Sequence, residues 1–575
     1  MTVAYVVVVA PVLGQMFRKF RSPWRPTGDD AIFAINAHDV FSWRPPLLGT
    51  YSVVARVGNE TPPLVYHLGP MVSWVLAIPE RFFGQRLGVA YGAAIVNTAM
   101  LFAAVWVVRR VFDERAALVA AIAIALMAWS VGHSTLAEPW NPYIGLWALP
   151  LICALACGVA VGVRWALAWL VVVASFAVQA HYLYLAIAAL VALACIVVAL
   201  TRTRVAPTER LSVGSLRWTL IALVVCWTPT LLQQMFGDPG NLLSWFRATT
   251  RATESKSGFL DFSFRYVVNS FAAPGLAVRG PLNPLEQLDL TYSPSTFGWV
   301  SAGAAAAFVV FMAVYFRSSR PSLAAFATVT VVVAIATTFT LSQLPASVLA
   351  FPYYRIVMLW FASTLLWACV VSGAFCLANS VRKVPSSVLV SEVVSKPRSL
   401  RSGFAGALTP TLIAVALAVA VLAVVSTSPE GPVDRIGAEA TGVMSDQGRR
   451  LLDPGRRYEV VGSGARGVFA AYGVFRDLHN AGFDVYVPND EVQLRRNYAV
   501  GSRDVDTLIV HSGAEALPAN AILIASFDGR SPADLRRYEL LSRGALNGDS
   551  SAATAFEQER FGIEQLQFRM YVLKK

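Results

Sequence analysis

Residues 88–108 read GVAYGAAIVNTAMLFAAVWVV, without a single charged side chain. A helix needs about 20 consecutive apolar residues to cross the hydrocarbon core of a bilayer. This stretch meets that length, and Arg109 and Arg110 follow it directly. A long apolar run that ends in a basic link predicts a membrane-spanning helix.

Further apolar runs repeat this pattern through most of the chain. They cover residues 2–17, 116–132, 143–163, 165–180, 183–200, 218–236, 296–316, 322–342, 353–377 and 404–425. Together they predict an α-helical polytopic membrane protein with about eleven transmembrane helices. The run at 2–17 lacks a charged start and a small-residue cleavage site, so we expect a span there and not a cleavable signal.

The composition excludes several classes of protein. Of the 575 residues, 56% are hydrophobic and only 14% are charged, whereas soluble domains carry about a quarter charged residues. An ordinary soluble enzyme, a disordered scaffold and a nucleic-acid-binding domain are therefore not expected. In a membrane protein, the net charge of +12 indicates loop arginines that set orientation.

Cysteine usage agrees with this assignment. All of the cysteines lie inside apolar runs, and no CxxC pairs with histidine at metal-binding spacing. We expect small buried thiols, with neither disulfides nor structural zinc. They are Cys153, Cys157, Cys195, Cys226, Cys369 and Cys376.

The charged links predict the orientation of the spans. With a cytoplasmic N-terminus, the inside links are basic: 109–115, Arg164, 201–217, 317–320 and 381–401. The outside links hold the polar, aromatic and acidic residues: 18–87, 133–142, around His181, 237–295 and 343–352. This assignment requires 62–84, which Pro70 and Pro79 interrupt, to lie at the outer surface as an interfacial helix.

The basic residues at 18–21 oppose this orientation, because they follow the first span on the predicted outside. Two explanations are open: the start codon is misplaced, or these residues bind an anionic lipid headgroup.

The chain changes character after residue 425. Residues 426–575 have a soluble composition, with predicted strands at 458–462, 484–487, 506–510 and 521–527 and a helix at 467–481. We therefore divide the chain into a transmembrane domain, 1–425, and a small α/β domain, 426–575. An odd number of spans places the α/β domain outside the cell, where it would guide a glycan acceptor or a partner protein.

Gly462, Gly464 and Gly467 superficially match the dinucleotide-binding pattern GxGxxG between a strand and a helix. No cytosolic nucleotide is available to a domain placed outside. A tight turn with close strand–helix packing is the expected cause of these glycines.

The first outer loop holds the most informative charges. Thr27 to Asp30 resemble a helix N-terminus, with a cap residue and acids in the first turn. Ile32, Phe33, Ile35 and Val40 suit a helix that lies flat on the membrane. Asp29 and Asp30, the acid pair, either cap this helix or carry chemistry.

The order of these features resembles the GT-C superfamily of membrane glycosyltransferases, which use polyprenyl-phosphate sugars. Protein O-mannosyltransferases, lipid A aminoarabinose transferases and actinobacterial arabinofuranosyltransferases belong to it. Asp29 and Asp30 match the place of the family's acidic pair, and residues 62–67 and 76–84 resemble its second interfacial helix. The resemblance covers about residues 1–425.

The resemblance implies a sugar transfer on the outer side of the plasma membrane. The partners would be the bilayer, a polyprenyl-phosphate sugar donor and a glycan, lipid or protein acceptor, with no nucleic acid. Arabinan or mannan of an actinobacterial envelope fits the Ala-, Val- and Arg-rich composition. A divalent metal is possible but not required, and inversion or retention is not determined.

The chemistry assigns roles to individual residues. A carboxylate can take the proton of the acceptor hydroxyl, so Asp29 is the expected base, with Asp30 as the alternative. Cations must stabilise the leaving phosphate. Arg355, beside Tyr354 at the outer start of a span, is the expected phosphate ligand, or else a snorkelling interfacial residue.

Weaker substrate-binding candidates occupy other outer positions. They are Arg44, Arg56, His67, Glu138 and His181, each with a structural role as the alternative; Asp39 is expected to form hydrogen bonds on its helix face. The long loop 237–295 is expected to cover the site, by binding the acceptor, unless part of it is disordered.

Two other functions compete with an enzyme. A transporter or flippase of lipid-linked glycans should carry ionisable residues in mid-span and repeated halves. The spans here are nearly free of charges and no repeat is evident, which favours the enzyme. The third possibility is a non-catalytic subunit of an envelope-synthesis complex, with the acid pair serving only as a helix cap.

Overall fold

The computed structural model describes residues 2–52, 64–205, 213–237, 240–251, 258, 263–278, 293–344, 353–381, 435–547 and 550–573. These fall into two compact units. The helical unit comprises Met1–Met16, Leu47–Val72 and Ala93–Gly431, and the sheet unit comprises Phe17–Pro46, Ser73–Gly92 and Pro432–Lys575. The sheet unit thus contains parts of the first outer loop as well as the C-terminal residues.

Apolar helices dominate the chain up to residue 381. They are α1 (Thr2–Arg21), α3 (Met71–Val111), α4 (Glu114–Val131), α5 (Asn141–Leu146), α6 (Leu149–Ala160), α7 (Ala166–Ala180), α8 (Leu185–Val205), α9 (Val213–Phe236), α12 (Thr296–Tyr315), α13 (Pro321–Ser342) and α15 (Met358–Val381). Shorter helices connect them: α2 (Gly28–Asp39), α10 (Asn241–Arg251), α11 (Phe264–Phe271) and the 3₁₀ helices η2 (His133–Ala137), η3 (Tyr182–Tyr184), η6 (Leu276–Val278) and η7 (Tyr353–Ile356).

Within the described ranges, 8 helical stretches are long and apolar enough to cross a membrane. Two shorter apolar helices, Ala166–Ala180 and Tyr182–Cys195, add to them. Each predicted span within these ranges coincides with one of these helices, and the predicted span 404–425 lies outside them. The chain is a multi-pass membrane protein.

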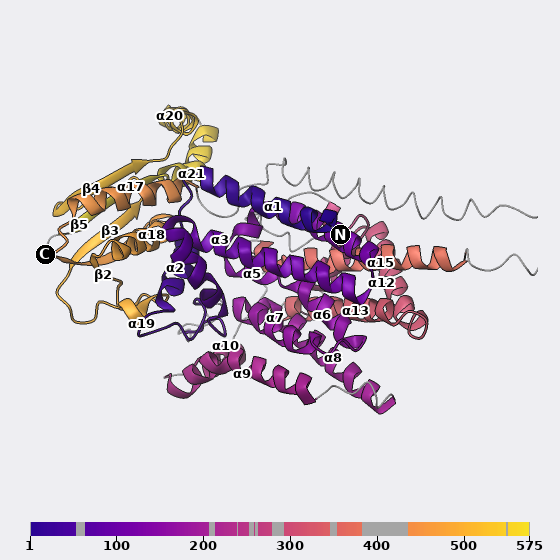
Figure 1. The fold of residues 1–575 in the computed structure, drawn as a ribbon. Helices are drawn as coiled ribbons and strands as arrows, with labels where there is room; N and C mark the ends of the chain where they lie inside the picture. The colour runs from indigo at the N-terminus through magenta and orange to yellow at the C-terminus, as the bar shows by residue number, and fades with distance from the viewer. Residues whose placement is uncertain are drawn as a thin grey trace, which may run out of the picture. The chain divides into compact units, whose positions relative to one another are not determined.

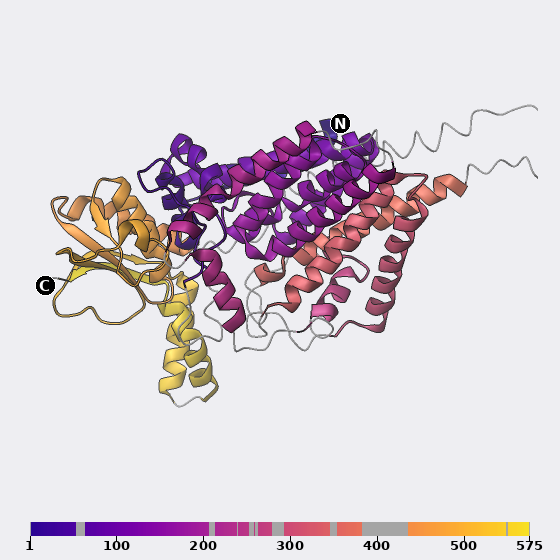
Figure 2. The same cartoon turned by 90° about the horizontal axis from the view of Figure 1, so that it is seen from below.

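Side-chain hydrogen bonds join the helices of the helical unit, which run side by side as a bundle (Figures 1 and 2). Trp360 of α15 donates to Ser130 of α4 at 3.0 Å, and Ser130 donates to the carbonyl of Leu276 at 2.7 Å. Trp227 of α9 donates to Ser175 of α7 at 2.9 Å. Such bonds matter in a bilayer, because lipid tails offer polar side chains no partner.

Helix α3 changes direction at Gly84, whose φ of 76° and ψ of 174° are not helical. The chain folds back there, since a Cβ on Gly88 would lie 2.5 Å from the Cα of Glu80. Residues 71–83 thus form a separate helix, with Trp74, Ile78 and Phe82 exposed along one face. This amphipathic helix agrees with the predicted interfacial segment.

The C-terminal part of the sheet unit is a mixed five-stranded sheet in the order β2-β1-β3-β5-β4. Its strands are β1 (Arg457–Ser463), β2 (Asp484–Tyr486), β3 (Asp506–Ser512), β4 (Ala521–Asp528) and β5 (Gln567–Leu573). Strand β1 pairs in parallel with β2 and β3, and β5 pairs antiparallel with β3 and β4. The four predicted strands are confirmed, and β5 was not predicted.

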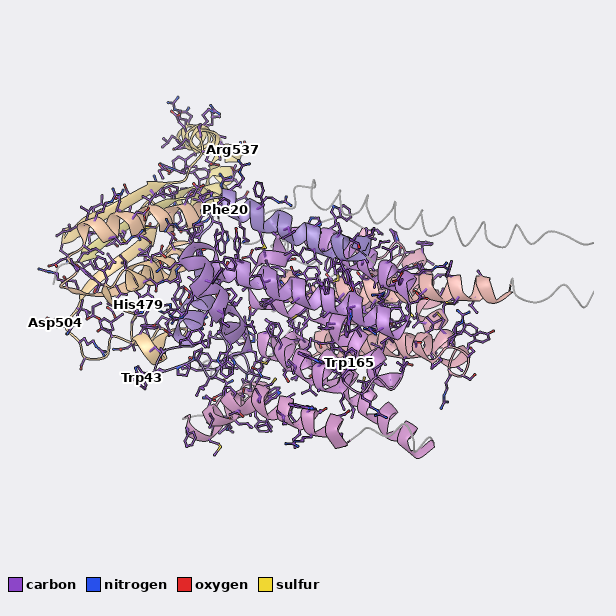
Figure 3. All side chains as sticks on the ribbon, in the orientation of Figure 1. Phe20, Trp43, Trp165, His479, Asp504 and Arg537 are labelled. Carbon is purple, nitrogen blue, oxygen red and sulfur yellow. The ribbon has the colours of Figure 1, made fainter. Side chains whose placement is uncertain are left out.

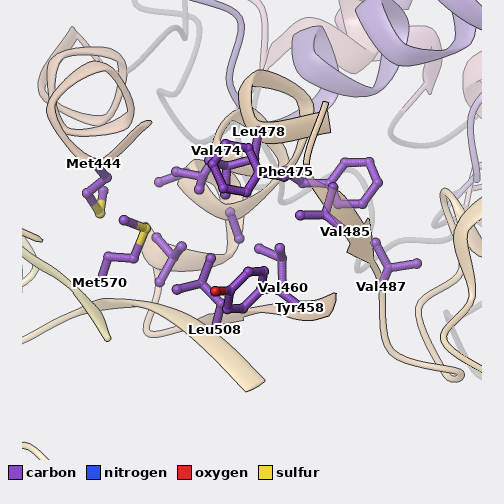
Figure 4. Close-up of a cluster of buried hydrophobic side chains, with 14 of the residues drawn as sticks. Met444, Tyr458, Val460, Val474, Phe475, Leu478, Val485, Val487, Leu508 and Met570 are labelled. Carbon is purple, nitrogen blue, oxygen red and sulfur yellow. The ribbon is translucent and has the colours of Figure 1, made fainter. Parts of the chain in front are cut away.

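Helices α17 (Arg435–Leu451) and α18 (Gly467–Asn480) pack on each other and on the strands (Figure 1). Met444, Val474, Phe475 and Leu508 belong to the buried core of this layer, which Figure 4 shows in close-up. The alternation of buried and exposed positions along β1 brings Tyr458 and Val460 into the same core.

Two further helices, α20 (Pro532–Leu546) and α21 (Ser550–Glu564), form a hairpin that projects from the sheet (Figure 2). Arg537 of α20 binds both carboxylate oxygens of Glu559 of α21 at 2.7 and 2.9 Å (Figure 3). This bidentate pair holds the two helices side by side.

Close packing explains the three glycines between β1 and α18. Gly464 has a φ of +79°, and a Cβ there would lie 2.0 Å from the carbonyl oxygen of Ser512. Cβ atoms on Gly462 and Gly467 would lie 2.5 Å from the backbone of Val468 and 2.7 Å from that of Val510. The predicted packing role is confirmed.

The amides at the start of α18 already have partners in the protein. Those of Arg466 and Gly467 donate to the hydroxyl of Ser512 at 3.0 and 2.9 Å. That of Ala465 donates to Gln565 at 2.9 Å. A dinucleotide phosphate would need these same amides, so this turn is not a nucleotide site.

We expect Gly464→Ala to lower the stability of the sheet unit by about 1–3 kcal/mol, because the residue combines a left-handed φ with backbone contact. The thermal unfolding midpoint of the purified full-length chain measures this. Gly562→Ala is the matched control: Gly562 lies in α21 with open space around it, so alanine there should raise the midpoint slightly. Equal midpoints for the two variants would contradict this account of the turn.

Candidate functional site

The acid pair lies at the start of α2, as predicted. Thr27 occupies the N-cap position with an extended backbone, but its side chain forms no cap hydrogen bond. Asp30 is buried at 5% exposure, whereas Asp29 is half-buried. Gly28 before them has a φ of +51°, and a Cβ there would lie 2.8 Å from the Phe469 ring. A larger residue at position 28 would therefore be strained by the left-handed φ and would push against the Phe469 ring.

Helix α2 packs on α18 through its apolar side chains. Ile32 and Ile35 belong to the buried core of the sheet unit, at 1% and 2% exposure. The expectation that these positions face the membrane is wrong, because the C-terminal residues cover them. An apolar helix face does not distinguish lipid from protein as its neighbour.

Hydrogen bonds hold the end of α2 in the same unit. Asp39 accepts bonds from Asn497 at 2.8 Å and from Tyr498 at 2.7 Å. Burial, reinforced by Asp39, raises the pKa of the Tyr498 hydroxyl, so it remains a donor. The predicted hydrogen-bonding role of Asp39 is confirmed, although its partners lie in the C-terminal part of the chain.

His38 and Glu80 face each other across α2 and residues 71–83, with Nδ1 and Oε2 3.6 Å apart. Glu80 is buried at 3% exposure. The nearby carboxylate of Glu80 raises the pKa of His38. Arg44, a weaker candidate, is exposed, and its carbonyl accepts a bond from Asn497 at 3.3 Å. Arg56 lies outside the described residues.

The helical unit brings three other candidates together. The rings of His67 and His181 lie 4.7 Å apart, and Arg355 is close enough to affect the titration of His181. His67, His181 and Arg355 are buried, at 4%, 6% and 8% exposure. We call them the basic cluster. They come from three different links between the apolar helices, so the fold assembles a buried group with cationic potential.

The basic cluster is neutral at its histidines. Burial lowers the pKa of His67 to about 3. Burial, followed by the influence of His67 and Arg355, lowers the pKa of His181 well below its ordinary value. The buried Nδ1 of His67 has no hydrogen-bond partner among the described residues. Buried polar atoms usually have a partner, so this nitrogen is available to water or to a ligand group.

Backbone hydrogen bonds fix the segment 64–70, which we call the His67 segment. The amide of His67 donates to the carbonyl of Thr50 at 2.9 Å, and the carbonyl of His67 accepts from the amide of Gly49 at 3.0 Å. Thr230 of α9 donates to the carbonyl of Leu68 at 2.5 Å. The position of the imidazole is therefore set by its backbone on both sides.

Helix α10, from the long loop 237–295, contacts the same segment. Asn241 exchanges two hydrogen bonds with the backbone of Tyr66, both at 2.9 Å. Trp245 donates to the carbonyl of Tyr66 at 2.7 Å and lies 5.4 Å from the ring of Tyr182. The described part of the long loop thus contacts Tyr66 and Tyr182, the chain neighbours of His67 and His181. Residues 252–257 and 279–292 lie outside the description.

Gln179 closes the segment from the side of α7. Its Nε2 donates to the carbonyl of Cys226 at 2.8 Å, and its Oε1 accepts from the amide of Met71 at 3.4 Å. A Cβ on Gly69 would lie 2.0 Å from that Oε1. Only glycine leaves room for this contact.

Glu138 is buried at 1% exposure in the link between η2 and α5, directly after η2. Helix α5 packs against both η3, which follows His181, and η7, which contains Arg355. The structure therefore gathers the links that carry Glu138, His181 and Arg355. Tyr354 lies in η7, but its side chain is outside the described residues.

Sequence reasoning missed the residues that position the basic cluster. Asn241, Trp245, Gln179 and Thr230 make these contacts, and Asn241 lies 175 residues from Tyr66 in the chain. The one available signal was the length of the loop 237–295. Among the residues that the structure describes, no group of three or more His, Cys, Asp or Glu side chains could hold a metal. Metal use stays an open prediction.

No protein-family model matches the chain, and a comparison with curated protein sequences finds no relative. Among solved structures, ArnT from Cupriavidus metallidurans bound to undecaprenyl phosphate is similar, with a TM-score of 0.48 and 13% identity over 88% of this chain and 92% of that one. The oligosaccharyltransferase AglB from Archaeoglobus fulgidus gives 0.40 and 14% identity over 89% and 69%. Both structural neighbours are GT-C superfamily members.

His67 makes stability depend on pH in one direction. Its folded pKa of about 3 lies below the ordinary value of 6.5, so the unfolded chain binds a proton first as the pH falls. The contribution of neutral His67 to the free energy of unfolding is full above pH 6.5. It declines below that pH, by at most about 1.4 kcal/mol per pH unit. We expect His67→Gln to flatten the decline of the unfolding midpoint between pH 7.5 and 4.5.

His38 makes stability depend on pH in the opposite direction. Glu80 raises its pKa, so its contribution is full below pH 6.5 and is lost as the pH rises through the folded value. His38→Gln should therefore cost stability at pH 5.5 and little at pH 8.5. If His67→Gln and His38→Gln changed the pH profile in the same direction, the assigned protonation states would be incorrect.

Proposed function

We propose that the chain is a membrane glycosyltransferase that moves a sugar from a polyprenyl-phosphate donor to an acceptor hydroxyl. The buried basic cluster is the observation that carries this proposal. Two neutral histidines and an arginine, held by a network of backbone bonds, form a site for an anionic group at the border of the apolar spans. A lipid phosphate supplies such a group together with an apolar tail.

The reaction divides the residues into two roles. The acceptor oxygen forms a bond to the anomeric carbon while the bond from that carbon to the phosphate oxygen breaks, and the phosphate leaves with the electron pair. Arg355, with His67 and His181, stabilises the charge on the leaving phosphate. A carboxylate of the acid pair takes the acceptor proton. Asp29 is the base and Asp30 the alternative.

The position of the acid pair supports this role. Both carboxylates lie at the start of α2, and a carboxylate within hydrogen-bond reach of an acceptor hydroxyl can take its proton. Thr27, and not an aspartate, occupies the N-cap position of α2. Serving as the N-cap residue therefore does not account for the acids, although both lie in the favoured first turn.

The proposal also includes the side of the membrane on which these residues act. We place the acid pair, the basic cluster and the C-terminal residues on the outer side of the plasma membrane, where the acceptor is a cell-envelope glycan, lipid or protein. An arabinofuranosyl or mannosyl group is the proposed sugar. Glu138, Tyr354 and Arg44 are the proposed additional substrate contacts.

Substitution of the acid pair and of Arg355 tests the activity. Asp29→Asn should reduce sugar transfer or release from the accepted donor by about 10²–10⁴-fold, the range of a lost general base. Arg355→Gln should reduce kcat and raise KM for the donor, since it removes a phosphate ligand. Arg164→Gln, an exposed arginine in another link, is the control and should keep wild-type rates.

The outcomes separate the alternatives. If Asp29→Asn is active and Asp30→Asn is not, the base is Asp30. If both single variants and the double variant keep wild-type turnover, the acid pair has no catalytic role. If the wild-type chain transfers no sugar from any polyprenyl-phosphate donor but moves lipid-linked glycans across vesicle membranes, it is a flippase.

Labelling in intact cells tests the orientation. A membrane-impermeant maleimide should label Ser502→Cys in the sheet unit without lysis, and should label Ser318→Cys only after lysis. Both positions are exposed, and the native cysteines among the described residues are buried or half-buried. The reverse pattern would place the sheet unit in the cytoplasm and contradict the proposed side.

A further inference from the structure

A cavity of about 480 Å³ lies between α3, α4, α6, α13 and α15 of the helical unit. We call it the five-helix cavity. Its volume falls within the range of about 300–1,000 Å³ that is usual for small-molecule sites. None of its lining residues belongs to the acid pair or the basic cluster. It therefore needs an occupant other than the proposed reactants at that site.

Small side chains create the cavity. Ala116, Ala120 and Ala123 line it from one face of α4, and Ala154 of α6 and Ala368 of α15 line it from other sides. The spacing of three and four residues places the α4 alanines in one row. Most of the remaining lining side chains are apolar, so water would gain few hydrogen bonds inside. The interior suits a hydrocarbon chain.

Aromatic rings form part of the wall near the links. Phe112, at the end of α3, and Phe326 of α13 both line the cavity and meet edge to face with their centroids 6.1 Å apart. Polar lining residues from the neighbouring links and helix starts gather at one end: Asp113, Ser319, Arg320 and Ser322. Thr364 and Ser372 of α15 also line the cavity, and their hydroxyls donate to the carbonyls of Trp360 and Ala368 in the same helix. The cavity thus has an apolar interior and a polar end.

Arg320 is the cation at that polar end. Its guanidinium lies 5.8 Å from the centroid of the Phe316 ring. Asp113 lines the same end, and one of its carboxylate oxygens accepts the amide of Ala116 at 2.8 Å as the cap of α4. Arg317, in the same link, is exposed. The guanidinium of Arg320 is the group at this end that an anion would contact.

We propose that the five-helix cavity binds an anionic phospholipid, with an acyl chain among the alanines and the phosphate against Arg320. An apolar interior with an arginine at its end complements a molecule with a hydrocarbon tail and a negative head. Basic pockets between transmembrane helices bind anionic lipid headgroups in this way. The links 109–115 and 317–320 supply further arginines for the headgroup, and by the predicted orientation they face the cytoplasmic leaflet.

Lipid titration of the full-length chain tests the proposal. The protein in detergent is titrated with phosphatidylglycerol or phosphatidylcholine, and native mass spectrometry counts bound lipids. We expect phosphatidylglycerol to bind more tightly, and Arg320→Gln to weaken it by about fivefold, the effect of one cation near a headgroup. Arg317→Gln, exposed in the same link, should change binding less than Arg320→Gln.

Photocrosslinking locates the acyl chain. Phosphatidylglycerol with a diazirine in its tail should crosslink to peptides of α4 or α15 that line the cavity. Ala123→Phe should abolish this crosslink by filling the cavity. Ile122→Phe, on the same helix but outside the lining, should preserve it. Thermal unfolding midpoints verify that each variant is folded.

Several results would overturn the proposal. They are equal binding of phosphatidylglycerol and phosphatidylcholine, crosslinks that persist in Ala123→Phe, and tight binding of polyprenyl phosphate with none of phosphatidylglycerol. Binding of inorganic phosphate that competes with the lipid headgroup, without any crosslink of the tail, would indicate an anion site only. Sugar transfer is measured separately, so a failed lipid assay leaves the proposed function standing, and the reverse also holds.

Discussion

Buried backbone polar groups must find partners within the protein, and this constraint shapes the region around His67. The His67 segment is irregular, so it cannot satisfy its own amides and carbonyls as a helix does. Thr50, Thr230 and Asn241 satisfy them from three other parts of the chain. Residues that are far apart in the sequence therefore meet at this segment.

A segment held in this way can keep a buried side chain in an unfavourable environment. Loss of one partner would leave a backbone group unsatisfied, at a cost of about 1–3 kcal/mol. The hydrogen bonds of this network therefore offset the free-energy cost of burying His67, whose Nδ1 has no partner among the described residues. Preorganisation of this kind is what a binding site needs, since the site does not reorganise when its ligand arrives.

The sequence allowed the spans and most of the sheet to be predicted, because both leave strong local patterns. Long apolar runs admit few alternatives in a bilayer, and the alternation around Tyr458 and Val460 marks a half-buried strand. The neighbour of α2 could not be predicted. Ile32 and Ile35 form an apolar face, but its partner is helix α18 of the same unit, which lies more than 400 residues later in the chain. A local sequence pattern indicates which residues are buried, but not which part of the chain covers them.

The candidate site, like the fold, could be predicted from the sequence only in part. His67, His181 and Arg355 could be singled out because polar residues at the ends of apolar runs are costly and few. Their assembly into one buried cluster, and the roles of Asn241 and Gln179, depend on tertiary contacts that no spacing encodes.

The protonation states of the basic cluster limit how it can act on a ligand. Burial keeps His67 neutral, with a pKa of about 3, because an unpaired charge there would lack both water and a counterion. A phosphate brought into the cluster reverses this balance, since its negative charge stabilises a protonated imidazole. Anion binding and proton uptake are then coupled. A histidine that is neutral in the free protein is therefore compatible with the proposed phosphate site. Its neutral form avoids the free-energy cost of burying a charged imidazole while no anion is bound.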